Sequence, residues 1–105
     1  MIAKDFIFKL PEKVRKEAVE GMETTFHFEL SGNDGGDFTL SLKDGVLTAD
    51  EGLVGEPKCV VKASGYNFMK VVTGELNPLM AILTGKLKVS NQGEMVRYAK
   101  IFGLM

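Results

Sequence analysis

The 105-residue chain contains no tryptophan, one histidine and one cysteine, and no charge of either sign predominates. Because Cys59 is the only cysteine, no disulfide can form within the chain, and His27 alone cannot build a histidine-rich metal site. Thirteen basic against fourteen acidic residues give a net charge of −1, which offers no electrostatic attraction to nucleic acid. No apolar run approaches the ~20 residues of a membrane span. These absences exclude a disulfide scaffold and argue against a metalloenzyme, a nucleic-acid-binding protein and a membrane-spanning protein.

Composition is that of an ordinary globular domain. Hydrophobic residues make up 45% of the chain and charged residues 26%, and the length suits one domain with one core. At the N-terminus, Asp5 and Lys9 interrupt any apolar run of the kind found in a secretory signal. We therefore expect a single domain over residues 1–105 and a cytoplasmic protein.

The first third of the chain predicts helix and then strand. Residues 5–10 predict one or two helical turns, and Pro11 predicts the start of a second, charged surface helix over residues 12–20 that ends at Gly21. Alternating apolar residues then predict strands over residues 24–30 and 37–43. The dipeptide Asp44-Gly45 is a strong signal for a tight hairpin.

Two further strands are predicted over residues 45–49 and 58–63, and helices follow. Ser64 is a candidate N-cap for a helix over residues 66–73. After Gly74, Asn77 and Pro78 form a cap and first turn for a helix that ends near Thr84. A fifth strand over residues 86–90 and a last helix over residues 92–102 complete the chain.

This order predicts an α+β fold: a five-stranded, mostly antiparallel sheet with helices packed on one face. The fifth strand follows a crossover through two helices, and we expect that crossover to allow parallel pairing with an earlier strand. The stretch from Leu76 to Gly85 has no charged residue. A short helix that is apolar almost all round requires burial on both sides. We expect the sheet on one side and a second helix, a partner chain or an apolar ligand on the other.

No residue pattern predicts catalysis. His27 falls on the polar face of its strand, which predicts a solvated side chain, and Cys59 lies mid-strand, which predicts a buried structural thiol. Lys86 and Lys88 face outward on the last strand, where solvation explains them. A basic rim for a carboxylate or a phosphate is the alternative. We predict no catalytic residue, no metal, no cofactor and therefore no enzyme.

Positions in the second half of the chain resemble the sterol carrier protein type 2 family. The matching residues are Gly74, Leu76, Pro78, Ala81, Gly85, Lys86, Leu87 and Val89. Residues 25–32 resemble the family's first strand, and residues 38–45 resemble its second strand and turn. The resemblance implies the same α+β arrangement, with an apolar tunnel between the sheet and the helices.

From the residues alone, plain core or a dimer surface explains the surplus of apolar side chains in the second half. With the resemblance, an apolar ligand cavity becomes the better interpretation. The partner would then be a hydrophobic small molecule or lipid: a fatty acid, a fatty acyl-CoA, a sterol or an isoprenoid. The predicted ligand-binding residues are Phe26, Phe28, Leu40, Phe68, Val72, Leu76, Leu79, Met80, Leu83, Met95 and Phe102.

An empty cavity of this kind would be costly. Leaving ~300 Å³ unfilled costs about 7 kcal/mol, which is comparable with the whole stability of a small domain. We therefore expect the protein either to carry a ligand when purified or to collapse partly without one. The alternative function is an interaction module: a homodimer, or an accessory factor of a lipid or quinone biosynthetic enzyme.

Overall fold

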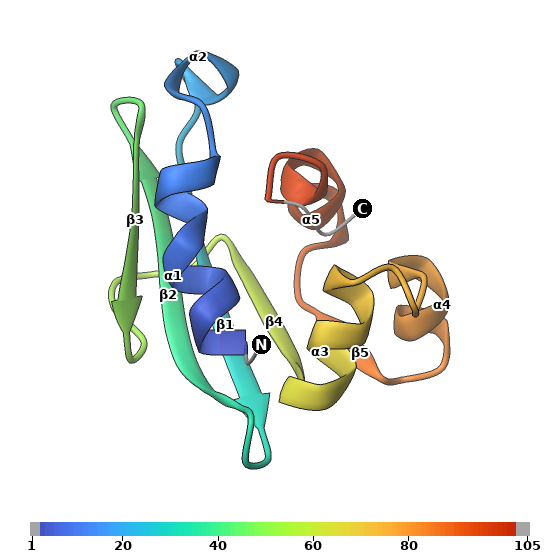
Figure 1. Cartoon of the computed structure of the whole chain (residues 1–105). Coiled ribbons are helices and arrows are strands. Elements are labelled where there is room, and N and C mark those ends of the chain that lie inside the picture. Colours follow the sequence, from blue (N-terminus) through green and yellow to red (C-terminus); the bar gives the residue numbers. More distant parts are fainter. Residues whose placement is uncertain (1–2, 103–105) are drawn as a thin grey trace.

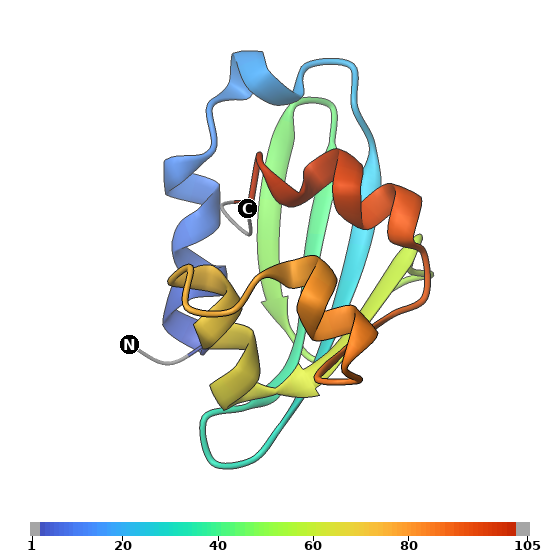
Figure 2. The same cartoon turned by 90° about the vertical axis from the view of Figure 1, so that its right-hand side faces the viewer.

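The computed structural model describes residues 3–102, which form a mixed sheet with helices on one of its faces (Figures 1 and 2). The predicted α+β class is confirmed. In chain order the elements are α1 (Ala3–Lys13), α2 (Lys16–Val19), β1 (Thr24–Ser31), β2 (Gly36–Lys43), β3 (Val46–Glu51), β4 (Cys59–Ser64), α3 (Gly65–Val72), α4 (Pro78–Leu83), β5 (Leu87–Val89) and α5 (Gln92–Ala99).

The five strands lie in the order β3-β2-β1-β4-β5. Three of the four pairings are antiparallel, and the parallel pair is β1 with β4, in register from Phe26 opposite Cys59 to Ser31 opposite Ser64. The predicted mostly antiparallel sheet is confirmed, and the parallel pairing that the crossover allowed for β5 does not occur, because β5 pairs antiparallel with β4 at the sheet edge. The parallel pairing arises earlier, where the chain leaves β3 at one edge and passes to the other side of β1.

The first helix is longer than predicted. α1 runs without interruption from Ala3 to Lys13 and contains Pro11 in its last turn, so Pro11 does not start a second helix. A proline inside a helix removes one hydrogen bond, but Phe6, Ile7 and Leu10 are buried and hold the helix on the sheet. The residues after it form only the four-residue α2.

Local turn and cap signals are confirmed. Asp44 and Gly45 both have positive φ, at 54° and 76°, as a two-residue type I′ hairpin requires. The side chain of Ser64 accepts a hydrogen bond from the backbone N–H of Asn67 and caps α3. The side chain of Asn77 accepts bonds from the N–H groups of Leu79 and Met80 and caps α4.

The outer face of the sheet, away from the helices, is partly covered by the loop after β3. His27 is buried there, with 6% of its surface exposed, and its Nε2 donates to the carbonyl oxygen of Val54 at 2.9 Å. The buried Thr39 hydroxyl donates to the carbonyl of Gly52 and accepts from the N–H of Val54. The prediction of a solvated His27 is therefore wrong, because strand alternation does not reveal a loop that returns over the polar face. In the part of the chain that the structure describes, no helix is long and apolar enough to cross a membrane.

Candidate functional site

The space between the sheet and the helices is occupied by a connected set of aromatic rings. Phe26 and Phe28 of β1 stack at 6.0 Å between ring centroids. Phe26 meets the ring of Phe102 edge-on at 5.4 Å, and Phe28 meets Phe68 of α3 at 5.5 Å. The Tyr98 ring of α5 packs against Phe26 at 5.9 Å. We call these five residues, Phe26, Phe28, Phe68, Tyr98 and Phe102, the aromatic cluster.

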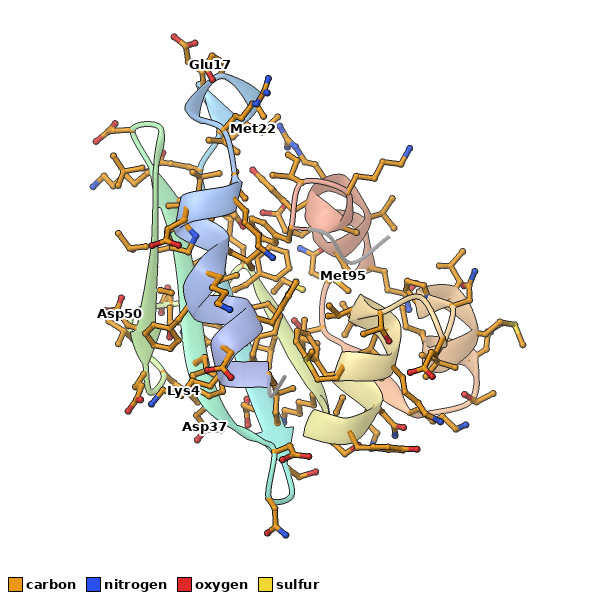
Figure 3. The ribbon with its side chains drawn as sticks, in the orientation of Figure 1. Lys4, Glu17, Met22, Asp37, Asp50 and Met95 are labelled. Carbon is orange, nitrogen blue, oxygen red and sulfur yellow. The ribbon has the colours of Figure 1, made fainter. Side chains whose placement is uncertain are left out.

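Eight of the eleven predicted ligand-binding residues lie together at this interior. Six are buried in one hydrophobic core: Phe26, Phe28, Leu40, Phe68, Met95 and Phe102. Val72 and Leu76 are partly buried and pack against that core. Met95 lies on the side of α5 that faces α3 (Figure 3). The rings already fill the centre, so a ligand there would have to displace side chains or separate the helices from the sheet.

The other three predicted residues do not line this interior. Leu79, Met80 and Leu83 are exposed on α4, and Ala81 is the only residue of that helix that is fully buried. Of the three covers expected for the outer side of α4, a second helix of this chain is therefore not found among the described residues, and a partner chain or an apolar ligand stays a prediction. An absence of charge can identify an apolar helix, but it cannot identify which of its faces packs against the rest of the chain.

Polar contacts fasten α5 to the sheet. The Thr24 hydroxyl, at the start of β1, donates to Glu94 Oε2 at 2.6 Å, and the Tyr98 hydroxyl donates to the carbonyl of Glu23 at 3.4 Å. Burial raises the pKa of Tyr98 above its usual value. Asn91 caps α5 by accepting from the Glu94 N–H, and its own side-chain N–H donates to the carbonyl of Lys58. No comparable set of side-chain bonds is found for α4, whose side-chain bonds within the described residues are confined to its own ends.

A polar hollow of about 660 Å³ lies where β1, β4 and β5 meet the start of α3 and the end of α4. Its charged side chains are Glu29, Asp37, Lys62, Lys86 and Lys88, and Lys62 Nζ lies 4.0 Å from Glu29 Oε1. Three lysines against two carboxylates favour a small anion over an apolar chain. Of these residues only Lys86 and Lys88 were candidates from the sequence, because Glu29 and Lys62 come together only through the register of β1 with β4.

The remaining candidate groups are structural. Cys59 is fully buried, as predicted, and its Sγ lies 3.5 Å from the carbonyl oxygen of Asn91. Burial raises the pKa of this thiol, which opposes the thiolate that a nucleophile needs. Across residues 3–102 no group of three or more His, Cys, Asp or Glu side chains could hold a metal ion.

The N-terminal helix contributes side chains to the interior that were not predicted. Phe6 of α1 meets the Phe68 ring edge-on at 6.0 Å, and Ile7 is completely buried. The signal was present, because Ala3, Phe6, Ile7 and Leu10 follow the spacing of one helical face. The expected break at Pro11 obscured it.

Comparison with known proteins matches this architecture. The chain is similar to hydroxysteroid dehydrogenase-like protein 2 of Xenopus tropicalis, with 35% identity over 97 residues that cover 88% of this chain and 22% of the relative. The human protein of the same name is 33% identical over 95 residues and is likewise covered to 22%. The chain thus spans about a fifth of the length of these curated relatives.

Solved structures share the fold. A sec-alkylsulfatase, Pisa1 from Pseudomonas sp., superposes with a TM-score of 0.79 at 22% identity, over 100% of this chain and 16% of that one. Palmitated SCP2L2 from Aedes aegypti superposes with a TM-score of 0.67 at 18% identity, over 97% of this chain and 95% of that one. UbiJ-SCP2, a ubiquinone synthesis protein, superposes with a TM-score of 0.62 at 17% identity, over 95% of this chain and 85% of that one. The SCP-2 sterol transfer family matches residues 4–102, nearly the whole chain, and the protein belongs to that family.

Proposed function

We propose that the protein binds and carries a hydrophobic, lipid-like molecule between its sheet and its helices, without catalysing a reaction. The observation that supports this most is the coincidence of the family match with a continuous apolar interior built on the aromatic cluster. Burial of an alkyl chain there would supply affinity at about 0.8 kcal/mol per CH₂ group. Fatty acids, fatty acyl-CoAs, sterols and isoprenoids all satisfy this chemistry.

Entry of the ligand would require the helices on the α4 side to move. α5 is fastened by side-chain bonds of Thr24, Glu94 and Asn91, whereas α4 is held by the buried Ala81 and the partly buried Ile82. An element with little buried apolar surface opens at low cost in free energy. We therefore place the ligand beneath α3 and α4, against Phe28 and Phe68. The prediction that Phe26, Leu40, Val72, Leu76, Met95 and Phe102 complete the lining is retained.

The first test is native mass spectrometry of freshly purified protein, followed by solvent extraction of the same sample. We expect an adduct of a few hundred daltons that extracts as lipid. Protein saturated with lipid at about 100 times its Kd should gain about 2.7 kcal/mol of stability, which raises Tm by about 10 °C or more relative to delipidated protein. A clean mass with added palmitate, palmitoyl-CoA or cholesterol, and an unchanged Tm, would refute the proposal.

A matched pair of variants tests where the ligand lies. Val72→Trp adds bulk at a partly buried position against the core, and Val96→Trp makes the same change at an exposed position on α5. Overfilling an apolar site costs about 1–3 kcal/mol, so Val72→Trp should weaken palmitate binding on the order of tenfold while Val96→Trp leaves it unchanged. Equal palmitate affinities of the two variants would mean that the ligand does not bind in this interior.

The second candidate function is an interaction module within or beside an enzyme. It is favoured by the exposed apolar side chains of α4 and by the curated relatives, in which the matched region is only 22% of the protein. UbiJ-SCP2, described as a ubiquinone synthesis protein, supports a version in which the domain assists an enzyme. A homodimer belongs to the same class. A concentration-dependent mass without lipid uptake would favour this function over carriage. The cytoplasmic location remains a prediction in either case.

A further inference from the structure

One row of charged side chains crosses four strands on the outer face of the sheet. Asp37 of β2 lies opposite Glu29 of β1. Across the next two pairings, Lys62 of β4 lies opposite Glu29, and Lys88 of β5 lies opposite Lys62. Residues directly opposite one another on neighbouring strands share a face of the sheet. Because the two neighbours of Glu29 along β1 are buried in the core, the row points away from the helices, to the far side of the strands in Figure 2. We call these four residues the charged row.

The order of charges in the row is costly to the fold. Asp37 and Glu29 place two negative charges opposite one another, and Lys62 and Lys88 place two positive charges opposite one another. Like charges in such a pair destabilise a sheet. Of the four side chains, only Glu29 and Lys62 form an ion pair within residues 3–102, at 4.0 Å between Oε1 and Nζ. Proteins break the local rules of stability chiefly at functional sites, which makes the row a candidate for ligand binding.

The charged row lies in the polar hollow of about 660 Å³ described above. All four of its residues line that hollow, and Lys86, just before β5, adds a third positive charge at the lysine end. Ser31, Ser64 and Asn67 also line it, and their hydroxyl and amide groups can bond the peptide groups of a ligand. The volume falls within the range of small-molecule sites, about 300–1,000 Å³. The hollow therefore suits a small molecule that has a positive and a negative end.

We propose that this hollow binds a short zwitterion, with the ligand's ammonium group at the two carboxylates and its carboxylate at the three lysines. The centres of the two like-charged pairs are separated by two strand spacings, about 9.6 Å. An extended tripeptide has nearly the same length, about 10 Å, so a tripeptide with free termini is the class of ligand that fits. Each end of the ligand supplies the opposite charge that a like-charged pair lacks. A simple anion would leave the acidic end of the row unpaired.

A second copy of this chain is the main alternative occupant. The row has two negative and then two positive charges, so a copy related by a two-fold axis would place each charge against one of opposite sign. Two copies of a concave face leave the space between them unfilled, however, whereas a tripeptide occupies it. The concavity therefore favours the small ligand over the homodimer.

Titration of the full chain with triglycine, followed through the backbone amide signals in NMR spectra, tests the proposal. Triglycine has both terminal charges and no apolar side chain that would suit the proposed lipid site. It should bind saturably, with shifts concentrated at amides of β1, β4 and β5. Its affinity should fall as salt is raised, because the contacts are exposed. Protein saturated with palmitate should bind triglycine equally well, which separates this site on the outer face from internal carriage.

Two related peptides test the need for both charges. N-acetyl-triglycine retains only the carboxylate, and triglycinamide retains only the ammonium group. Each should bind at least about fivefold more weakly than triglycine, because it loses the contacts of one end and exposed ion pairs contribute modestly.

Two variants locate the ends of the ligand. Lys88→Gln should weaken the binding of triglycine and N-acetyl-triglycine about threefold, but not that of triglycinamide. Asp37→Asn should weaken the binding of triglycine and triglycinamide about threefold, but not that of N-acetyl-triglycine. Both variants should keep or raise the parent Tm, because each removes one charge of a like-charged pair. A loss caused by misfolding would not depend on which charged end the peptide has.

The matched controls are Lys43→Gln and Asp50→Asn, which remove the same charges at exposed strand positions that do not line the hollow. Both should bind triglycine like the parent protein. Three results would overturn the proposal: no saturable binding of triglycine, equal binding of all three peptides, or equal losses in the variants and their controls. A mass that rises with protein concentration without peptide, and no longer does so in Lys88→Gln, would replace the tripeptide with a second copy of the chain.

Discussion

The helices α1 and α4 lie beside the same sheet, but their sequences and their burial are opposite. α1 contains Lys4, Asp5, Lys9, Glu12 and Lys13 and still buries four side chains, because its apolar residues share one face. α4 contains no charge and buries only Ala81. Lys4 of α1, labelled in Figure 3, also forms an ion pair with Glu51 of β3, whereas α4 has no charged group with which to form one. The comparison teaches that the periodicity of apolar residues predicts burial, whereas their abundance does not.

The largest expected effect comes from truncating equivalent apolar residues on the two helices. Ile7→Ala on α1 removes a completely buried side chain and should lower the free energy of unfolding by about 2–5 kcal/mol. Leu83→Ala on α4 should change it by less than about 0.5 kcal/mol, because that side chain is mostly exposed. Urea unfolding of both variants measures the difference. A large loss from Leu83→Ala would mean that α4 packs on another surface in solution.

A second pair of variants tests the close contact between the first residue of α3 and the β1–β2 turn. A Cβ at Gly65 would lie 2.4 Å from the carbonyl oxygen of Asp34 in the β1–β2 turn. Since backbone would have to move, Gly65→Ala should cost about 1–3 kcal/mol in thermal or urea unfolding.

Gly93→Ala is the matched control for Gly65→Ala. It adds the same atom in the first turn of α5, where the nearest atom is the Asn91 Oδ1 at 3.6 Å. It should be neutral or should stabilise the protein by up to about 1 kcal/mol. A loss equal to that of Gly65→Ala would contradict the proposed backbone clash.

A third variant sharpens the contrast between a firmly held and a weakly held helix. Asn77→Ala removes the side-chain cap of α4 and should cost about 1 kcal/mol of local stability. We expect faster hydrogen exchange at amides of α4, while amides of α1 and β1 are almost unaffected. Ser64→Ala, which removes the cap of the better-buried α3, should instead lower the stability of the whole domain by a similar amount. If both variants instead raised hydrogen exchange equally at amides of all elements, α4 would unfold only together with the rest of the protein.

The smallest expected effect is a pH dependence at Cys59. Burial raises the pKa of this thiol above its ordinary value of 9.0 in the folded protein. The unfolded chain therefore releases the proton first, so stability is complete below that value and falls as pH rises through it. Between about pH 8 and about pH 10, the stability of the parent should fall slightly more than that of Cys59→Ala, with Tyr98 contributing equally to both. An equal fall in stability with pH for the parent and for Cys59→Ala would contradict the burial of the thiol.

The amino-acid sequence alone determined the local structure of this protein. The alternation of Phe38, Leu40 and Leu42 specifies a strand with one buried face, and Asp44-Gly45 specifies the hairpin because both residues adopt positive φ. Asn77 and Ser64 specify helix starts through hydrogen bonds that span only two or three residues. These features depend on neighbours in the chain, which is why a pattern can predict them.

Only the tertiary structure decided which surfaces are covered. The burial of His27 depends on a loop that begins more than twenty residues later, and the parallel pairing of β1 with β4 depends on where the chain crosses the sheet. The ring of Phe68 meets that of Phe28 because α3 follows β4, and β4 is the neighbour of β1. Leu83, in contrast, remains exposed because no described element packs over it. Burial is a property of the assembled layers rather than of a residue. For that reason the sequence could name the apolar side chains of this protein but could not distinguish those of its interior from the exposed Leu79, Met80 and Leu83 of α4.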